Sequence, residues 1–380
     1  MPERITNSLH LWIPIRNENC YNVRNELLKG DINVKISEHV FGKINEVDVM
    51  AITLENKSGA SITATTFGAT LLEWSAPDKD GNFANITIGL DNLDDYVNNR
   101  PYYGATIGRV AGRIADGKFE MNGEKYQLAQ NNNGNHLHGG TNGLDTKIWD
   151  YQVENDETEA RIIFTCEDPA GSNDYPGTLS VTVIYTFTEA NEWKITYKAT
   201  TDAPTLYNPT NHVYFNLNGD MEGTILEHDL YVNAEKFVEL NDNTIPTGNK
   251  VSVEGTPFDF RTPTQTKQAS ESEHPQTKAV SGLDHPFVLN AGENAVSATI
   301  SDKKSGRRVE MTTTEPIVVV FMHNGPSGFE YKGKTLPAYV GITLESQNYP
   351  DSINQDDFGN TILNPGETYL SETVYKFSVE

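Results

Sequence analysis

The stretch Val181-Thr182-Val183-Ile184-Tyr185-Thr186-Phe187 decides the fold class. Every second side chain in it is a large apolar one, and the same alternation returns in Trp193-Lys194-Ile195-Thr196-Tyr197-Lys198. Alternate side chains of an extended chain lie on opposite faces, so each run predicts a strand with one face in a core. The continuous apolar run Ile317–Met322 predicts a strand buried on both faces. Further strands are predicted at 49–54, 61–67, 339–344 and 373–379.

Dipeptides typical of tight turns separate these runs. Asp80-Gly81 is a hairpin signal, and Asp116-Gly117 and Asn122-Gly123 bracket Lys118–Met121 as a short strand of a tight hairpin. No segment has a convincing helical period, and the polar stretch 262–281 is interpreted as a surface loop within one domain. Many short strands with regular turn signals predict an all-β sandwich or barrel.

The composition narrows the class of partner. The 380 residues carry a formal net charge of −24, which argues against nucleic-acid binding and against binding to an anionic membrane surface. The two cysteines, Cys20 and Cys166, are interpreted as free thiols in a reducing compartment. The apolar run 9–15 is too short for an export signal and no membrane span is predicted, so a cytoplasmic location is expected.

Residues 1–33 differ from the rest of the chain because they show no clear period and carry scattered charges. They are interpreted as an N-terminal extension, either a tail or an added edge element. An alternative is that translation starts at Val34, because Lys29-Gly30-Asp31 can be encoded by a purine-rich ribosome-binding sequence. The orderly pattern of strands begins at Val34, so residues 34–380 are the expected main domain.

The first candidate for chemistry is the stretch Tyr207-Asn208-Pro209-Thr210-Asn211-His212-Val213-Tyr214-Phe215-Asn216-Leu217. Pro209 favours an extended entry, after which alternate side chains point to opposite sides. One side is apolar. The other carries an imidazole, a phenol and an amide, from His212, Tyr214 and Asn216, and this set suits a polar ligand.

A second candidate is Asn135-His136-Leu137-His138-Gly139-Gly140. His136 and His138 would share a face of a strand, and the glycine pair allows a backbone or a ligand to approach closely. A metal site built on two histidines at this spacing needs a carboxylate soon after them, which is missing here. Zinc-type spacings are also absent from the sequence, so no catalytic metal is expected. The alternative for either histidine is a buried ring that bonds backbone groups.

A third candidate combines arginine and glutamate. Gly108-Arg109-Val110-Ala111-Gly112-Arg113 does not match a phosphate-binding loop, and its arginines are either solvated surface charges or forked donors to hydroxyl oxygens. Glu345 ends the predicted apolar strand 339–344, either as a rim charge or as a site carboxylate. Motifs for a serine or cysteine nucleophile are absent from the sequence. A glutamate and histidines remain, which suit paired general acid and base catalysis.

Together these motifs resemble the aldose 1-epimerases, also called galactose mutarotases, over about residues 34–380. Seven markers follow in the order of that family: Phe67-Gly68-Ala69-Thr70, Gly108–Ile114, His136–Gly140, Asn208–Leu217, Pro257-Phe258-Asp259-Phe260-Arg261, Leu283-Asp284-His285-Pro286-Phe287 and Leu344-Glu345-Ser346-Gln347-Asn348. One departure stands out, because Gly112 occupies a position that is usually asparagine in the family. A glycine there removes one polar contact to the sugar and could widen the site.

The resemblance implies a large antiparallel β-sandwich of the galactose mutarotase type, an open sugar-binding cleft and no cofactor. It implies that Glu345 is the catalytic base, His212 the general acid and His138 a second active-site histidine. It implies a further set of sugar ligands, namely Arg113, Asp284 and Gln347. The expected activity is the interconversion of the α and β anomers of hexoses such as galactose and glucose, by ring opening and closure.

Four alternatives stay open from the sequence. A hexose 6-phosphate epimerase would want clustered basic residues, which the net charge does not encourage. An enzyme acting on the reducing end of maltose-like disaccharides would differ only in how open the cleft is. A glycosidase would want two carboxylates, which Glu345 and Asp284 could supply. A non-catalytic sugar-binding module would not need both Glu345 and His212. The oligomeric state cannot be read from the sequence.

Overall fold

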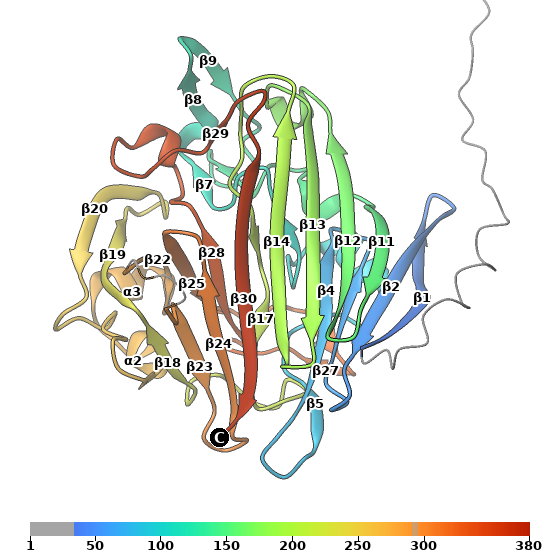
Figure 1. Cartoon of the computed structure of the whole chain (residues 1–380). Coiled ribbons are helices and arrows are strands. Elements are labelled where there is room, and N and C mark those ends of the chain that lie inside the picture. Colours follow the sequence, from blue (N-terminus) through green and yellow to red (C-terminus); the bar gives the residue numbers. More distant parts are fainter. Residues whose placement is uncertain (1–33, 291, 293–294) are drawn as a thin grey trace, which may run out of the picture.

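The computed structural model describes residues 34–290, 292 and 295–380, and strands dominate this part of the chain (Figure 1). The strands of every sheet pair antiparallel, which confirms the predicted all-β class. Residues 1–33 lie outside the described residues, so the predicted extension stays a prediction. The described residues contain no helix that is both long and apolar enough to cross a membrane.

The largest sheet has nine strands and contains the two runs that predict the fold. In spatial order its strands are β11 (Asp150–Asn155), β12 (Glu159–Asp168), β13 (Leu179–Thr188), β14 (Glu192–Thr201), β30 (Tyr369–Val379), β24 (Arg307–Thr313), β23 (Ala298–Ser301), β18 (Asp229–Val232) and β21 (Thr264–Gln265). The C-terminal strand β30 lies in the middle of this sheet, hydrogen-bonded to β14 on one side and to β24 on the other (Figure 1).

Two further sheets pack with the first. The five-stranded sheet is formed in chain order by β1 (Lys35–Ile44), β2 (Val47–Glu55), β3 (Ser61–Thr65), β4 (Thr70–Pro77) and β5 (Phe83–Asn85). The six-stranded sheet has the order β17 (Tyr214–Phe215), β28 (Ile342–Gln347), β25 (Ile317–Met322), β22 (Asp284–Leu289), β19 (Ala234–Leu240) and β20 (Pro246–Ser252). β25 has the predicted bounds, and most of its side chains are buried on both faces.

Trp74 marks the place where the three sheets share one core. It comes from β4 and is fully buried, and its ring packs edge-on against Trp193 of β14 at 6.0 Å and Phe215 of β17 at 6.4 Å between ring centroids. Such edge-to-face pairs add to the free energy gained by burying their area. The single core therefore fixes the six-stranded sheet, which carries much of the site, against the nine-stranded one.

Short strand pairs complete the described part of the chain. They are β6 (Thr106–Ile107) with β16 (Thr210–Asn211), β7 (Arg113–Ile114) with β10 (His136–Leu137), β8 (Lys118–Met121) with β9 (Glu124–Gln127), β15 (Thr205–Leu206) with β29 (Ile362–Leu363), and β26 (Glu330–Tyr331) with β27 (Lys334–Thr335). The β8–β9 hairpin, with Asn122 and Gly123 both at positive φ in its turn, is the predicted one. The pairs β6–β16 and β7–β10 bring distant motifs together.

The predicted loop at 262–281 is wrong, because the segment contains β21 and two short helices, α2 (Lys267–Ser270) and α3 (Pro275–Val280). The third short helix of the described chain is α1 (Leu93–Asn99). Pro275 sits in the first turn of α3, where its missing N–H costs nothing, and the His274 side chain caps that helix. Ala269 and Thr277 are buried, so small side chains anchor these polar helices. Such residues form no helical pattern of large apolar side chains, which is why the sequence did not predict the helices.

Two strand boundaries also differ from the predicted ones. The strand expected at 339–344 lies at 342–347, since Tyr339 has a left-handed backbone with φ of 58°. Glu345 is thus inside the strand. The strand expected through 207–217 is divided into β16 and β17, and both of its faces are buried. Asn216 does not face a ligand, because its amide donates to the carbonyls of Gly223 and Val340.

Candidate active site

A cavity of about 190 Å³ lies over one face of the six-stranded sheet, and all six predicted site residues line it. Its floor uses alternate residues of three neighbouring strands, which must share a face of the sheet. These are Asp284 and Pro286 of β22, Val319 and Phe321 of β25, and Glu345 and Gln347 of β28. The walls come from elsewhere in the chain, with Tyr102, Gly112, Arg113, Leu137, His138, His212, Tyr214, Leu240, Thr244, Pro246 and Pro350.

Glu345 and His212 form the central pair of the cavity. Glu345 lies on β28, and His212 lies in the connection between β16 and β17, where β17 pairs with β28. The His212 Nε2 atom is 3.4 Å from the Glu345 Oε1 atom, and the two side chains are only 7% and 4% exposed. A carboxyl group and an imidazole thus meet with little solvent between them. Both groups line one cavity and are close enough together to act on the same small molecule.

Burial changes the pKa values of this pair in opposite directions. Loss of solvent raises the pKa of Glu345 to about 8, although the Thr343 hydroxyl and the charge of Arg113 act in the lowering direction. Loss of solvent also lowers the pKa of His212 to about 4, although the nearby carboxyl groups of Asp284 and Asp145 act in the raising direction. A raised pKa makes the carboxylate a stronger base, and a lowered pKa makes the imidazolium a stronger acid.

His138 packs beside this pair. Its ring meets the His212 ring edge-on at 5.3 Å between centroids and the Tyr102 ring at 5.0 Å, and its Nδ1 atom accepts the Gly112 N–H at 3.2 Å. The Tyr102 ring also stacks on His212 at 6.0 Å. Burial holds the pKa of His138 well below its usual value. With Nδ1 accepting, the neutral ring carries its proton on Nε2 and is a donor there.

His136 and His138 do not share a strand face, so that expectation is wrong. β10 ends at Leu137, and His138 has a left-handed backbone with φ of 50°, which turns its side chain away from the strand pattern. His136 is fully buried outside the cavity. It bonds the Ala129 carbonyl through Nδ1 and the Tyr175 hydroxyl through Nε2, both at 2.7 Å. It is therefore the structural histidine that the alternative interpretation describes.

The three predicted sugar ligands differ in how free their polar atoms are. Arg113 of β7 uses its Nε atom to donate to Asn132 at 3.1 Å, which leaves its terminal nitrogens for another acceptor. The Gln347 Nε2 atom donates to the Asn348 carbonyl, whereas its buried Oε1 atom has no partner among the described residues. Burial raises the pKa of Asp284 to about 6, with Arg113 acting to lower it. The set offers donors and acceptors suited to sugar hydroxyl groups.

Gly112 borders the cavity but does not simply widen it. A Cβ atom added there would lie 2.9 Å from the Cβ atom and 3.0 Å from the Cγ atom of Pro350, and the φ of Gly112 is 72°. Pro350 is itself a lining residue and fills part of the space that a side chain at 112 would need. The glycine and the proline therefore form a matched pair at this wall.

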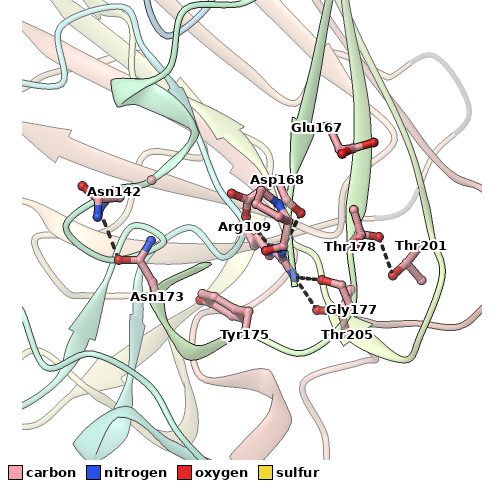
Figure 2. A network of polar contacts seen from close by, with 12 residues as sticks. Arg109, Asn142, Glu167, Asp168, Asn173, Tyr175, Gly177, Thr178, Thr201 and Thr205 are labelled. Atoms are coloured by element: carbon pink, nitrogen blue, oxygen red, sulfur yellow. Dashed lines mark hydrogen bonds and ion pairs between the residues drawn. The ribbon is translucent and has the colours of Figure 1, made fainter. Parts of the chain in front are cut away.

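A buried network around Arg109 holds the loop between β12 and β13 (Figure 2). Arg109 is 1% exposed, and its Nε atom donates to Asp168 at 2.6 Å while its terminal nitrogens reach Pro176, Gly177 and Thr205. The guanidinium carbon also lies 5.4 Å from the centroid of the Tyr175 ring, over its aromatic face. Arg109 is thus a structural ion pair and not the solvated charge that the sequence allowed.

The network reaches the glycines after His138 through the same loop. Asn173 accepts the backbone N–H of Asn142 (Figure 2), and a Cβ atom on Gly140 would lie 2.6 Å from the Asn173 side chain. A Cβ atom on Gly139 would lie 1.8 Å from the Gly108 carbonyl oxygen. Only glycine fits here, which confirms the close backbone approach that the sequence predicted.

Two residues that shape the site were not found by sequence reasoning. Tyr102 stacks on the His212 ring and meets the His138 ring edge-on, and Thr343 donates to Glu345 Oε1 at 2.8 Å. Tyr102 follows Arg100-Pro101 and has a φ of 64°, so the nearby proline and Gly104 were the available signals of an irregular segment. Thr343 lies two residues before Glu345, and this spacing alone would have placed it on the same face.

The described residues place no cysteine and no cluster of metal ligands in the cavity. Cys166 is a half-buried free thiol on β12 whose burial raises its pKa to about 12, and Cys20 lies outside the described residues. No group of three or more His, Cys, Asp and Glu side chains within 34–290, 292 and 295–380 is placed to hold a metal ion.

Comparison with known proteins gives one consistent result. The model of the aldose 1-epimerase family matches residues 50–376. Galactose mutarotase from Bos taurus is 38% identical over 318 residues, which cover 83% of this chain and 90% of the relative. Aldose 1-epimerase from Escherichia coli (strain K12) is 34% identical, with coverage of 87% and 95%.

The solved structures agree in fold as well as in sequence. The crystal structure of galactose 1-epimerase from Lactobacillus acidophilus NCFM superimposes with a TM-score of 0.81 at 32% identity, and the match covers 91% of this chain and 99% of that chain. The all-β sandwich is therefore shared along nearly the whole length of that protein. From its sequence, its fold and the extent of both matches, this chain belongs to the aldose 1-epimerase family.

Proposed function

We propose that the protein interconverts the α and β anomers of aldohexoses such as galactose and glucose, with Glu345 as base and His212 as acid. The observation that carries this proposal is the buried pair with 3.4 Å between His212 Nε2 and Glu345 Oε1, in a cavity lined by polar groups that suit sugar hydroxyls. Aldose 1-epimerases are isomerases, and the family match supports this reaction class.

The reaction needs one proton removed and one proton added. The Glu345 carboxylate takes the proton of the anomeric hydroxyl while the His212 imidazolium gives its proton to the ring oxygen. The bond between the anomeric carbon and the ring oxygen breaks, and the anomeric C–O becomes a carbonyl. The open aldehyde turns about the bond between its first two carbons. The ring then closes with the two proton transfers reversed, which restores both residues.

The remaining cavity groups position the sugar in this proposal. Arg113 and His138 offer N–H donors, whereas Asp284 and Gln347 Oε1 offer acceptors. Among the described residues, Arg113 is the only lysine or arginine that lines the cavity, and it faces two carboxyl groups. A phosphate group on the sugar would find little compensation there, which disfavours hexose 6-phosphates.

Substitution of either central residue tests the proposal. We expect Glu345→Gln and His212→Gln each to lower the rate of anomer interconversion by about 10²- to 10⁴-fold, because each removes one proton transfer. Polarimetry on freshly dissolved α-D-galactose, α-D-glucose and maltose measures the rate. Matched controls are Glu315→Gln and His228→Gln, which change a carboxyl group bonded to Tyr369 and a buried imidazole bonded to Leu217, both outside the cavity.

The outcomes separate the alternatives. Near-normal turnover in either active-site variant would remove that residue from the mechanism. Release of free glucose from maltose would indicate a glycosidase using Glu345 and Asp284, and binding without acceleration on any sugar would indicate a binding module. Faster relaxation of maltose than of the monosaccharides would assign the site to disaccharides.

A further inference from the structure

The two carboxylate oxygens of Glu345 have different surroundings. Oε1 accepts the Thr343 hydroxyl at 2.8 Å and lies 3.4 Å from His212 Nε2. No hydrogen bond from the described residues reaches Oε2. The hydroxyl and the imidazole thus lie on one side of the carboxylate, and the other side is left to whatever occupies the cavity.

The backbone determines the direction of the Thr343 hydroxyl. The Phe321 N–H of the neighbouring strand β25 donates to Thr343 Oγ1 at 3.2 Å. A hydroxyl has one hydrogen, so an oxygen that accepts from Phe321 directs its own hydrogen to its remaining partner, Glu345 Oε1. Thr343 is fully buried, with 0% exposure, and water does not compete for this bond.

We propose that Thr343 is a positioning residue that gives the two oxygens of Glu345 separate roles. Oε1 is the anchored oxygen, and Oε2 is the oxygen that takes the proton from the sugar and returns it. This inference rests on the proposed function, in which Glu345 is the base. Thr343 does not line the cavity and acts only through Glu345.

The chemistry of the bond gives Thr343 two effects. A hydroxyl that donates to a carboxylate favours its charged form, so Thr343 acts against the burial that raises the pKa of Glu345. The same bond prevents rotation of the carboxyl group, which would otherwise exchange its two oxygens. A buried carboxyl without this anchor would be harder to ionise and would present its basic oxygen to the sugar for only part of the time.

The test compares Thr343→Val, which keeps the shape but removes the hydroxyl, with Thr343→Ser, which keeps the hydroxyl. We expect Thr343→Val to lower kcat about ten- to a hundredfold, the range for a lost hydrogen bond to a charged group, with little change in KM. The alkaline limb of its pH profile should move up by about one unit, because the pair then holds its last proton to higher pH. Thr343→Ser should retain the native profile.

Thr266→Val is the matched control. It also removes a fully buried threonine hydroxyl, which donates to the Ile225 carbonyl at 2.6 Å, but it lies outside the cavity and does not contact Glu345. We expect a similar loss of thermal stability in Thr266→Val and Thr343→Val, with the native kcat and pH profile only in the former. This comparison separates the loss of the bond to Glu345 from the general effect of removing a buried hydroxyl group.

Three results would overturn the inference. They are a Thr343→Val enzyme with native kcat and pH profile, a Thr343→Ser enzyme whose alkaline limb moves, or a titration of Glu345 that is the same with and without the hydroxyl. The last is measured by NMR on protein carrying ¹³C-labelled glutamate, with Glu345→Gln to assign the signal, and it needs no turnover. The Thr343→Ser measurement still tests the inference if the Thr343→Val protein does not fold. An active Glu345→Gln enzyme would instead sink the proposed function itself.

Discussion

At the wall of the cavity, Pro350 limits which side chain can stand at position 112. Asparagine tolerates a positive φ better than most side chains, yet any Cβ atom at position 112 would meet Pro350 at 2.9 Å. We expect Gly112→Asn to destabilise the fold by about 1–3 kcal/mol, because Pro350 must move to make room for the new side chain. We also expect it to raise KM, because Pro350 lines the cavity and its movement changes the shape of the site.

The measurement is thermal unfolding and sugar kinetics on Gly112→Asn, Pro350→Ala and the double variant. If the two residues are matched, Pro350→Ala should relieve part of the cost, so the double variant should be more stable than the sum of the single effects implies. Simple additivity of the two substitutions would mean that the wall rearranges without a clash.

The pH dependence of the reaction follows from the proton count of the central pair. Transfer requires one proton on Glu345 and His212 together. Burial raises the pKa of Glu345 to about 8 and lowers that of His212 to about 4, so the pair holds one proton between these values. That proton rests mainly on Glu345, and the carboxylate–imidazolium form that starts the reaction is the minor one-proton form in equilibrium with it. Below the lower value no base remains, and above the higher value no acid remains. We expect a bell-shaped profile of kcat/KM with limbs that belong to the pair.

Stopped-flow polarimetry across this range, corrected for the uncatalysed rate at each pH, measures the profile. The His212→Gln enzyme is the comparison, since its residual activity should lose one limb. A native profile that stays flat from acid to alkaline conditions would show that neither proton transfer limits the reaction.

The site residues that were predicted from the sequence stand in short motifs, whereas the two that were missed depend on contacts with distant parts of the chain. His212, His138, Arg113, Asp284, Glu345 and Gln347 stand in motifs, and all six line the cavity. Thr343 and Tyr102 act through partners that lie far away in the chain, Phe321 and the two imidazoles. The spacing places Thr343 on the face of Glu345, but its bond to the Phe321 N–H depends on strand register, and the position of Tyr102 depends on a left-handed turn.

At the scale of elements, strands with strict alternation were predicted well and irregular segments were not. β13, β14 and β25 have one dominant pattern each, whereas α2 and α3 are short and are anchored by single small residues. The break between β16 and β17 is another case. It is stabilised by bonds to different strands, β6 and β28, and these bonds place His212 beside Glu345.

The Arg109–Asp168 ion pair, at the end of β12, is expected to affect both stability and activity although it lies outside the cavity. We expect Asp168→Asn to lower the free energy of unfolding by about 3–5 kcal/mol, because it leaves the buried Arg109 charge without its carboxylate and also frees Lys147, now 2.8 Å from Asp168. Activity should fall as well, since the Arg109 network holds the loop that packs on Gly140 (Figure 2).

Denaturant unfolding monitored by tryptophan fluorescence gives the stability change. Asp202→Asn is the control, because its exposed carboxylate accepts one backbone N–H, from Thr178 at 2.6 Å, in the same region. We expect that control to cost much less than Asp168→Asn, because solvent replaces the lost bond. Equal effects of the two substitutions would contradict the importance of the buried pair.

At the scale of the whole molecule, the junction at Trp74 predicts a cooperative loss of structure. We expect Trp74→Ala to cost about 3–5 kcal/mol, because the ring joins the five-stranded sheet that carries it to side chains of the nine-stranded and six-stranded sheets. Calorimetry measures the shift in Tm. Phe83→Ala, which removes a ring that is 45% exposed, should change the stability by less than about 0.5 kcal/mol. Separate unfolding of one sheet in Trp74→Ala would show that the core is not a single unit.

The central place of β30 has a consequence for how the protein is made. The ribosome synthesises residues 369–379 after every strand that they join, since β14 ends at Thr201 and β24 at Thr313. Until that segment leaves the exit tunnel, the edges of β14 and β24 expose unpaired N–H and carbonyl groups that can pair with other chains. A nascent chain stalled shortly before β30 would therefore depend on chaperones, and the emergence of residues 369–379 from the exit tunnel would be the event that closes the sheet.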